Sequence, residues 1–420
     1  MKIRLILVKF FADLKLAIFL FLAIANFSAI GSVIEQNQPI QFYQKNYSNA
    51  LFGIFNSKLI LQIGLDHIFK TWWFITLLVL FGLSLTCCTF LQQLPALNRV
   101  RKVRFYSWQT KILKKFSINL NSRFWSVGRY ISSLRGKHYI VFQSNKNIYA
   151  QKGLIGRVSP IVVHFSMVLV LLGTILASTS GFIAQEFIPE TEIFYIQNIL
   201  NTNLNTSIPK ISGRVNDFWI SYKKDRSIKQ FYTDLSLIDN KGKEIKRETI
   251  YVNHPLKYNG LTFYQTDWNV VGFRIKETAK TYQFPVIKNS KNLFLSWIPN
   301  DFNKISSLNG FTLLSVANRE EVFLYDLSGS LLSKAELNEA INQGYFLGLI
   351  ETTGIQIKAD PGLGLIYFGF FLLIISIFTS YISHSQIWYI LENRKAYLKG
   401  INNRSKIEFE FEIFNLILKL

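Results

Sequence analysis

Four long stretches without Asp, Glu, Lys or Arg constrain this 420-residue chain more than any other feature. They occupy residues 16–34 (LAIFLFLAIANFSAIGSVI), 71–91 (TWWFITLLVLFGLSLTCCTFL), 158–179 and 361–383. A helix that crosses a hydrocarbon layer of about 30 Å needs about 20 such residues at 1.5 Å each. The first stretch is long for a cleavable signal sequence and has no clear cleavage site, so we expect it to be retained. The sequence therefore predicts an integral membrane protein with four transmembrane helices.

The basic residues are concentrated between the second and third stretches, and this distribution predicts the orientation. Residues 91–157 contain 14 Lys or Arg and no Asp or Glu, within a net charge of +21. Loops of this kind stay on the cytoplasm-like side of a membrane, where they face anionic lipid head groups. We expect segments 1–15, 92–157 and 384–420 on that side, and segments 35–70 and 180–359 on the other. No RNP, zinc-finger or helix-turn-helix signature supports nucleic-acid binding instead.

The segment 180–359 reads as one large β-rich domain between the third and fourth helices. Its charge is nearly balanced, with 20 Lys or Arg and 18 Asp or Glu in residues 181–359. Alternating residues 214–222 and 230–238, followed by the turn 239–243, predict a hairpin. Asn259-Gly260 predicts a second tight turn. The spacing of Ser333 and Glu336 is that of a capping box and predicts a short helix over 334–342.

The only two cysteines, Cys87 and Cys88, are adjacent within the second apolar stretch. A disulfide between neighbours is strained, and the pair forms no C-x-x-C motif, so we interpret both as apolar packing residues. The β-rich domain then has no thiol. Any thiol chemistry there has to come from another protein.

Five histidines are the candidates for chemistry, because the domain shows no nucleophile elbow, phosphate loop or metal-spaced cluster. His164 lies inside the third stretch, six residues past Val158 and so about 9 Å along a helix that Ser159-Pro160 is expected to begin. An ionisable residue at that depth is a functional candidate, and a neutral imidazole can ligate haem iron there. The alternative is a hydrogen bond to a neighbouring helix. The others are expected at the outer interface (His67), at the inner end of the fourth helix (His384), in the basic loop (His138) and beside a turn (His254).

Seven stretches of the chain are informative when taken together. They are IANFSAIGSVIEQNQP (24–39), LQIGLDHIFKTWWF (61–74), FGLSLTCCTFLQQLPAL (81–97), GRVSPIVVHFSMVLVLLGTI (156–175), GFIAQEF (181–187), VNHPLKYNGLTFYQTDW (252–268) and ADPGLGLIYFGF (359–370). In this order they resemble the ResB/CcsB family, membrane subunits of the system II machinery that attaches haem to c-type cytochromes. The resemblance implies three helices, a domain facing the thylakoid lumen or periplasm, and a fourth helix. The basic segments would then be stromal.

The resemblance also implies a site and partners. His164 corresponds in place to the family's intramembrane histidine, which helps to bind haem b in transit as an axial ligand; His67 and His384 are weaker candidates for that role. The implied partner CcsA carries a tryptophan-rich haem-handling loop, which this chain lacks, since Trp72-Trp73-Phe74 is interfacial. Apocytochromes c (cytochrome f and a soluble lumenal c-type cytochrome) and thiol-reducing proteins are the other implied partners, besides membrane lipid.

We therefore expect an assembly factor that acts with CcsA in haem delivery and attachment, as a subunit of a cytochrome c synthase complex and not as a catalyst alone. The alternatives are a self-contained transporter or enzyme, and a scaffold without a haem ligand of its own. The helices offer few buried polar groups for a transport path. The absence of a transit peptide and the many Phe, Ile, Asn and Lys residues favour a plastid-encoded chloroplast thylakoid protein, with a cyanobacterial membrane as the alternative.

Overall fold

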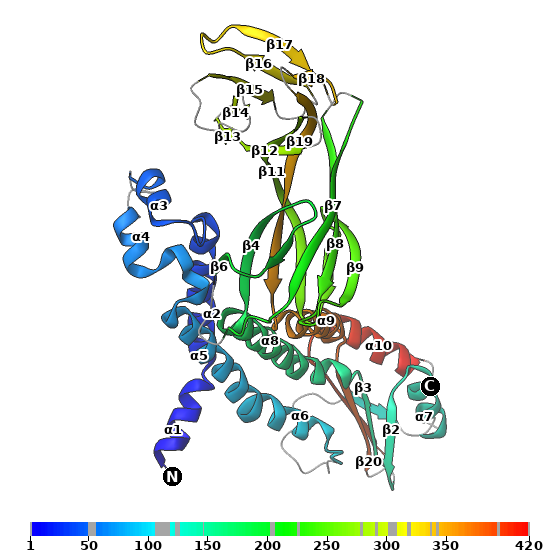
Figure 1. Ribbon diagram of the computed structural model, residues 1–420. Coiled ribbons are helices and arrows are strands. Elements are labelled where there is room, and N and C mark those ends of the chain that lie inside the picture. The colour runs from blue at the N-terminus through cyan, green and yellow to red at the C-terminus, as the bar shows by residue number, and fades with distance from the viewer. Residues whose placement is uncertain are drawn as a thin grey trace. The chain divides into compact units, whose positions relative to one another are not determined.

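The computed structural model describes residues 2–48, 56–105, 118–121, 127–145, 147–201, 206–224, 227–277, 280–289, 293–300, 309–316, 321–336, 338–341, 344–392 and 395–418. These residues form two compact units (Figure 1). The first, which we call the membrane unit, comprises Met1–Ser178 and Gly362–Leu420. The second, the strand-rich unit, comprises Thr179–Pro361.

The membrane unit begins with a series of helices, in which three short ones separate the long helices α2 and α5. They are α1 (Lys2–Phe11), α2 (Leu14–Val33), α3 (Ile40–Asn46), α4 (Ser57–Ile63), the 3₁₀ helix η1 (Leu65–Lys70), α5 (Trp72–Cys88), the π-helical turn η2 (Thr89–Gln93) and α6 (Leu94–Arg101). After the strand β1 (Ile118–Asn121) come α7 (Val127–Gly136), β2 (Ile140–Ser144), β3 (Asn147–Lys152) and α8 (Ile155–Ser180). The chain returns to this unit with α9 (Leu363–Ser380), β20 (Ser385–Glu392), β21 (Lys395–Asn402) and α10 (Lys406–Leu418).

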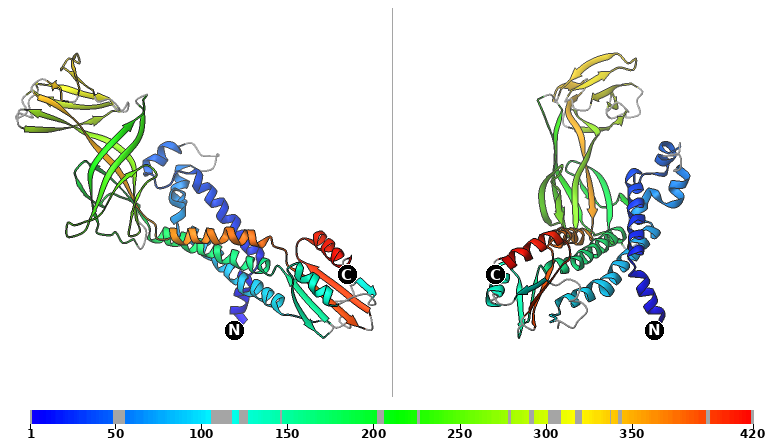
Figure 2. Two further views of the ribbon diagram at one scale, coloured as in Figure 1. Left: turned by 90° about the vertical axis from the view of Figure 1, so that its right-hand side faces the viewer. Right: turned by 180° about the vertical axis from the view of Figure 1, so that it is seen from behind.

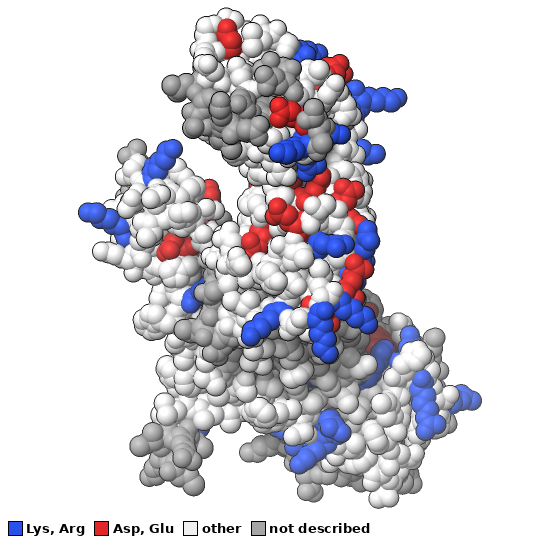
Figure 3. All heavy atoms as spheres, viewed as in Figure 1, with Lys and Arg blue, Asp and Glu red and all other residues white. Residues whose placement is uncertain are grey.

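Among the described residues, four helices are long and apolar enough to cross a membrane, which agrees with the predicted number of spans. They are Leu14–Val33, Trp72–Arg101, Ile155–Ser180 and Leu363–Ser380. The second continues past residue 91 because η2 and α6 extend α5 without a break. In the view of Figure 3, the Lys and Arg side chains of the membrane unit lie mostly beyond the uncharged surface of these helices. Which end faces which compartment stays a prediction.

The third helix begins earlier than predicted. α8 starts at Ile155, so Ser159-Pro160 lies inside the helix and does not cap it. The Ser159 hydroxyl instead donates to the Ile155 carbonyl, 2.9 Å away, and lies 2.8 Å from the Thr379 hydroxyl of α9.

Helices α8 and α9 pack on each other through small residues that recur at every seventh position. They are Ser159, Ser166 and Gly173 on α8, and Gly362, Gly369 and Ser376 at the cap and on the body of α9. A Cβ atom added to Gly173 would lie 2.8 Å from the Gly362 carbonyl oxygen, and one added to Gly369 would lie 2.7 Å from a Val170 methyl. Small residues of this kind let membrane helices approach closely. The two helices that flank the strand-rich unit in sequence therefore pack directly on each other.

A five-stranded antiparallel sheet, in the order β1-β21-β20-β3-β2, completes the membrane unit. Helices α7 and α10 pack on it through a core that includes Tyr130, Leu134, Ile387, Leu398 and Phe409. The sequence predicts a basic loop over 92–157 and a tail over 384–420, and gives no sign of this sheet. Because β20 pairs with β3, the segment before α8 and the segment after α9 lie at the same end of these helices.

The strand-rich unit contains three sheets among its described residues, as the predicted fold class requires. Its strands are β4 (Phe182–Pro189), β5 (Ile193–Tyr195), β6 (Ile199–Asn201), β7 (Ser212–Tyr222), β8 (Ile228–Ile238), β9 (Glu244–Tyr251), β10 (Leu256–Tyr258), β11 (Leu261–Glu277), β12 (Lys280–Pro285), β13 (Ile287–Lys288), β14 (Leu293–Pro299), β15 (Gly310–Val316), β16 (Val322–Tyr325), β17 (Leu331–Ala335), β18 (Ala340–Ile341) and β19 (Gly344–Ala359). The long strands β11 and β19 pair along almost their whole length. One half of this ribbon packs against β5-β7-β8-β9, and the other half packs against β13-β14-β15-β16-β17 (Figures 1 and 2).

Both predicted hairpins are confirmed. β7 pairs with β8 and β8 with β9, and the Asn259-Gly260 turn, with φ of 44° and 80°, joins β10 to β11. The helix predicted over 334–342 is wrong. β17 continues to Ala335 and β18 follows at Ala340, because pairing with β16 and β19 outweighs the local capping pattern.

Candidate functional site

His164 lies within α8, nine residues after Ile155 and so about 14 Å along the helix. Its side chain is half-buried against the end of α5 and the π-helical turn η2. Polar groups of three residues there, Leu85, Thr89 and Gln93, surround the imidazole ring.

Both ring nitrogens of His164 have partners. Nδ1 lies 3.1 Å from the Thr89 hydroxyl oxygen and 3.3 Å from the Leu85 carbonyl oxygen. Nε2 lies 3.0 Å from the side-chain nitrogen of Gln93, which is 3.4 Å from Nδ1. The interhelical hydrogen bond considered as an alternative to haem ligation therefore exists in the structure.

These partners determine which nitrogen carries the proton. The Thr89 hydroxyl donates its single proton to the Leu85 carbonyl, 2.8 Å away, so its oxygen faces Nδ1 as an acceptor. The Leu85 carbonyl can only accept. Nδ1 is therefore protonated and donates, which leaves the lone pair on Nε2 to accept from the Gln93 amide. Histidines that bind metals are commonly held in this way: one ring nitrogen donates to a protein acceptor, and the other carries the lone pair that binds the metal.

The π-helical turn carries two of the three partners, and Leu85 lies one turn earlier in α5. Thr89 and Gln93 begin and end η2, and single π turns inside helices are frequent at functional sites. The other side of the same helix is held by the turn between α1 and α2. There the Ser84 hydroxyl donates to the Phe11 carbonyl at 2.8 Å, and the Gln92 amide donates to the Ala12 carbonyl at 2.7 Å.

The Gln93 side chain is only half satisfied. Its amide nitrogen faces His164, but its Oε1 is buried and has no hydrogen-bond partner among the described residues. An unsatisfied buried oxygen costs free energy, so this contact is less favourable than a fully paired one. The Gln93 amide therefore occupies Nε2 of His164 only weakly, and a partner that binds this nitrogen more tightly can displace it.

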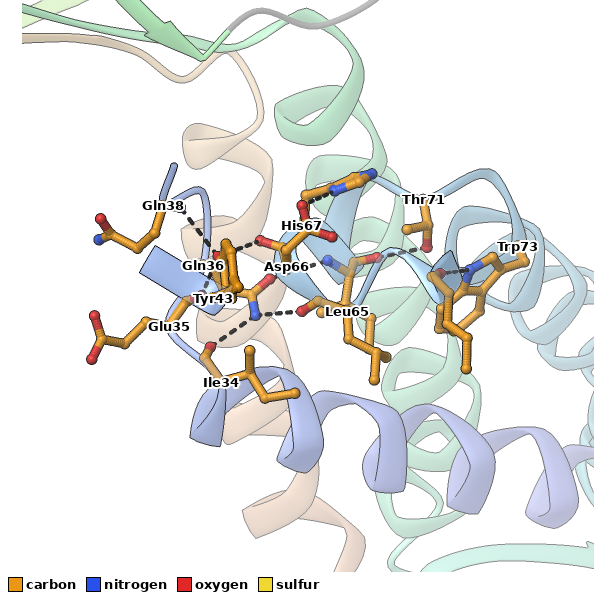
Figure 4. Close-up of polar contacts among 12 residues, drawn as sticks. Ile34, Glu35, Gln36, Gln38, Tyr43, Leu65, Asp66, His67, Thr71 and Trp73 are labelled. Carbon is orange, nitrogen blue, oxygen red and sulfur yellow. Dashed lines mark hydrogen bonds and ion pairs between the residues drawn. The ribbon is translucent and has the colours of Figure 1, made fainter. Parts of the chain in front are cut away.

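His67 belongs to the folded segment between α2 and α5 (Figure 4). Gln36 fixes this segment, since its amide nitrogen donates to the Leu65 carbonyl at 2.9 Å and its oxygen accepts from the Ile68 N–H at 3.1 Å. The His67 Nδ1 lies 2.9 Å from the Asp66 carboxylate, and the side chain is 47% exposed. A carboxylate on Nδ1 orients a histidine for ligation through Nε2. His67 is thus the better placed of the two weaker candidates.

His384 follows α9 and is almost completely buried, with 2% exposure. Its Nε2 has no hydrogen-bond partner among the described residues, while its backbone N–H donates to the Asn403 side chain at 2.8 Å. Burial, together with the positive charge of Arg157, lowers the pKa of His384 to about 4. The ring is therefore neutral at physiological pH and is enclosed by packing.

The three histidines are too far apart to hold one iron ion together. Metal–nitrogen bonds of about 2 Å place two axial nitrogens about 4 Å apart. His67 precedes α5, which begins at Trp72, whereas His164 contacts Thr89 just after the end of α5. Trp72 and Thr89 are about 26 Å apart along this helix. Gly156, which packs on the backbone just before His384, lies about 12 Å from His164 along α8.

The remaining sequence candidates have other surroundings. His138 is exposed, and the His254 ring stacks on Tyr251 with ring centroids 4.6 Å apart. Cys87 and Cys88 are free thiols and half-buried. No group of three His, Cys, Asp or Glu side chains in the described part of the chain is arranged to hold a metal ion.

Comparison with known proteins decides the family. Residues 14–310 and 279–413 match the sequence model of the ResB-like family. The chain belongs to the ResB-like family. Within it, a cytochrome c biogenesis protein Ccs1 from Thalassiosira pseudonana is 45% identical over 419 residues, which are 97% of this chain and 98% of that protein. A cytochrome c biogenesis protein CcsB from Crocosphaera subtropica is 43% identical over 434 residues, 99% of this chain and 94% of the relative.

Thr89 and Gln93 belong to the candidate site but are not among the residues that the sequence predicts. A signal for them was present, because they are polar, lie four positions apart and end an apolar stretch. Residues so spaced share a helix face. What the sequence did not reveal is that this face is turned toward His164.

Proposed function

We propose that this chain is a membrane assembly factor for c-type cytochromes, and that His164 holds haem iron during delivery. The proposal rests on the similarity to cytochrome c biogenesis proteins and on one observation of the chain's own structure. Nδ1 of His164 is fixed by two acceptors, and Nε2 keeps a lone pair inside a membrane-spanning helix. That is the nitrogen and the protonation state that haem iron requires.

In this proposal the membrane unit supplies one axial ligand and a partner protein supplies the other. Within the membrane unit, neither His67 nor His384 lies near enough to His164 to complete the pair. A CcsA-type haem-handling protein is the proposed partner, with apocytochromes c, such as cytochrome f and a soluble lumenal c-type cytochrome, as recipients. His67, with Asp66 on its Nδ1, is proposed as a weaker second station at the opposite end of α5.

The proposed location is the thylakoid membrane of a plastid, with the strand-rich unit in the lumen. The support is the basic segment 92–157, which favours the stromal side. The pairing of β20 with β3 puts the C-terminal residues 384–420 at the same end of α8 and α9 as this segment. The strand-rich unit follows the other end of α8 in the chain.

Deletion of the gene tests the function. We expect cytochrome f apoprotein to be made but to carry no covalent haem, which haem staining after denaturing electrophoresis detects. Reintroduction of the wild-type gene should restore the stain. Normal covalent haem in the deletion strain would refute the proposed role.

A further inference from the structure

The C-terminal helix α10 has two apolar stripes on opposite sides. One stripe, Phe409, Ile413 and Leu416, is buried in the core of the five-stranded sheet, with exposures of 5%, 9% and 2%. The other stripe is Ile407, Phe411 and Phe414, with exposures of 73%, 65% and 57%. At 3.6 residues per turn the centres of the two stripes lie roughly opposite each other. The side of a surface helix that normally carries polar residues is therefore apolar here, and we call it the outer stripe.

The sheet has one end from which both long helices depart. Lys152, Ser385 and Asn402 are partners across β3, β20 and β21 at that end. Lys152 lies three residues before α8 begins at Ile155, and Ser385 lies five residues after α9 ends. This row of residues marks the rim of the sheet nearest to the membrane spans.

α10 follows this rim from β21 toward β3. Just before it begins, the Asn403 side chain accepts from the His384 N–H, and the Arg404 guanidinium lies 5.7 Å from the centre of the Tyr381 ring. Midway along the helix, Glu412 pairs with Lys152 at 3.2 Å and accepts from the Tyr139 hydroxyl at 3.2 Å. The figures show α10 close to the end of α9 in each view (Figures 1 and 2).

Exposed apolar side chains continue from the end of α9 toward α10. Tyr381 and Ile382, which follow α9, are 73% and 44% exposed. Within α9 itself, Phe371 and Phe378 are 59% and 72% exposed, as expected for side chains that contact lipid in a spanning helix. The outer stripe has the same exposure and lies at the level where the span ends.

We propose that the outer stripe of α10 lies in the bilayer, at the boundary between head groups and acyl chains. Amphipathic helices bind there by burying apolar side chains. Glu408 and Glu410 are exposed on either side of the stripe, so apolar burial and not attraction to anionic lipid drives this contact. The contact should therefore be insensitive to salt. It would hold the sheet of the membrane unit against the membrane, independently of the proposed role in haem delivery.

Spin labelling of the full chain in phosphatidylcholine nanodiscs tests this proposal. Cys87 and Cys88 are replaced by Ala, and single labels are placed by Phe414→Cys on the outer stripe and by Asn415→Cys, which is exposed and lies about 100° further around the same helix. We expect the Phe414 label to collide more often with oxygen than with a water-soluble nickel chelate, and the Asn415 label to show the reverse. The preference should be the same in 0.1 and 0.5 M salt.

Two results would overturn the proposal. Dominant nickel collisions at position 414 would show that the stripe faces water. Protection from both reagents would show that it docks on protein, either a second copy or a partner. A label at Ile407→Cys repeats the measurement at a second position of the stripe, in case the first variant does not fold.

Discussion

Replacement of Gln93 by Leu should strengthen haem binding to the isolated chain. In the ligand-free protein the Gln93 amide donates to Nε2 of His164, the nitrogen that iron needs. Haem iron has to displace this hydrogen bond before it can bind. Leu has a similar volume but no donor, and it also removes the buried Oε1 that lacks a partner.

The size of the effect follows from that single hydrogen bond. Side-chain hydrogen bonds between membrane helices contribute about 0.6 kcal/mol on average and about 1.7 kcal/mol at most. Because about 1.4 kcal/mol corresponds to a tenfold change in affinity, the Kd for haem should fall roughly 3- to 18-fold. The Nδ1 contacts with Thr89 and Leu85 remain, so the protonation state of the ring is unchanged.

The assay is a haem titration of the purified chain in detergent, followed by the absorption band of bound haem. Gln92→Leu is the matched control, because the neighbouring amide donates to Ala12 and does not contact His164. It should leave the Kd unchanged. If Gln93→Leu weakened binding instead, Gln93 would assist the ligand and the displacement argument would fail.

Three further outcomes are expected. Gly369→Val should lower the stability of the α8–α9 pair by about 1–3 kcal/mol, because the added Cβ would meet Val170 and the backbone of α8. Gly364→Val, at a position that faces open space, should leave the stability unchanged, and thermal unfolding in detergent measures both variants. Burial and the neighbouring Glu190 raise the pKa of Glu351 to about 7, above its ordinary 4.5. The folded chain therefore retains a proton that the unfolded chain loses, so the free energy of unfolding should fall as pH rises from 4.5 to 7. Glu351→Gln should flatten that part of the plot of melting temperature against pH. The lowered pKa of His384 gives the opposite pH dependence, because the unfolded chain binds a proton there before the folded chain does; the free energy of unfolding should therefore fall as pH falls from about 6.5 to 4. His384→Leu should remove that fall without altering haem content.

The membrane spans and the hairpins were predictable because their signals are local. Twenty apolar residues in succession or an Asn-Gly turn specify their structure with little help from distant parts of the chain. The capping pattern at Ser333 and Glu336 is also local, but there the strands β16 and β19 offer pairing partners. Tertiary pairing then decided the outcome against the helix.

The sheet of the membrane unit could not be predicted for a different reason. Its strands β3 and β20 are more than 200 residues apart in sequence, separated by two spanning helices and the strand-rich unit. Nothing in either strand alone identifies the other. Gly153 and Gly156 allow the connection, because an added Cβ at either would lie within 2.1 Å of a carbonyl oxygen in residues 382–383.

The candidate site was predictable in part. His164 stands out by its depth in an apolar stretch, which is a property of the sequence alone. Its partners Thr89 and Gln93 depend on the rotation of one helix about its axis and on a π turn that shifts that rotation. Periodicity does not report either of these.

The most direct test of the proposed role is the haem spectrum of the complex purified from membranes, with wild-type chain and with His164→Ala. The account predicts that the variant accumulates normally, loses bound haem and cytochrome maturation, and regains part of both when imidazole supplies the missing nitrogen. A purely structural histidine would instead weaken assembly, and imidazole would not help. A stable His164→Ala complex with its full content of haem would contradict the assignment of His164 as the ligand.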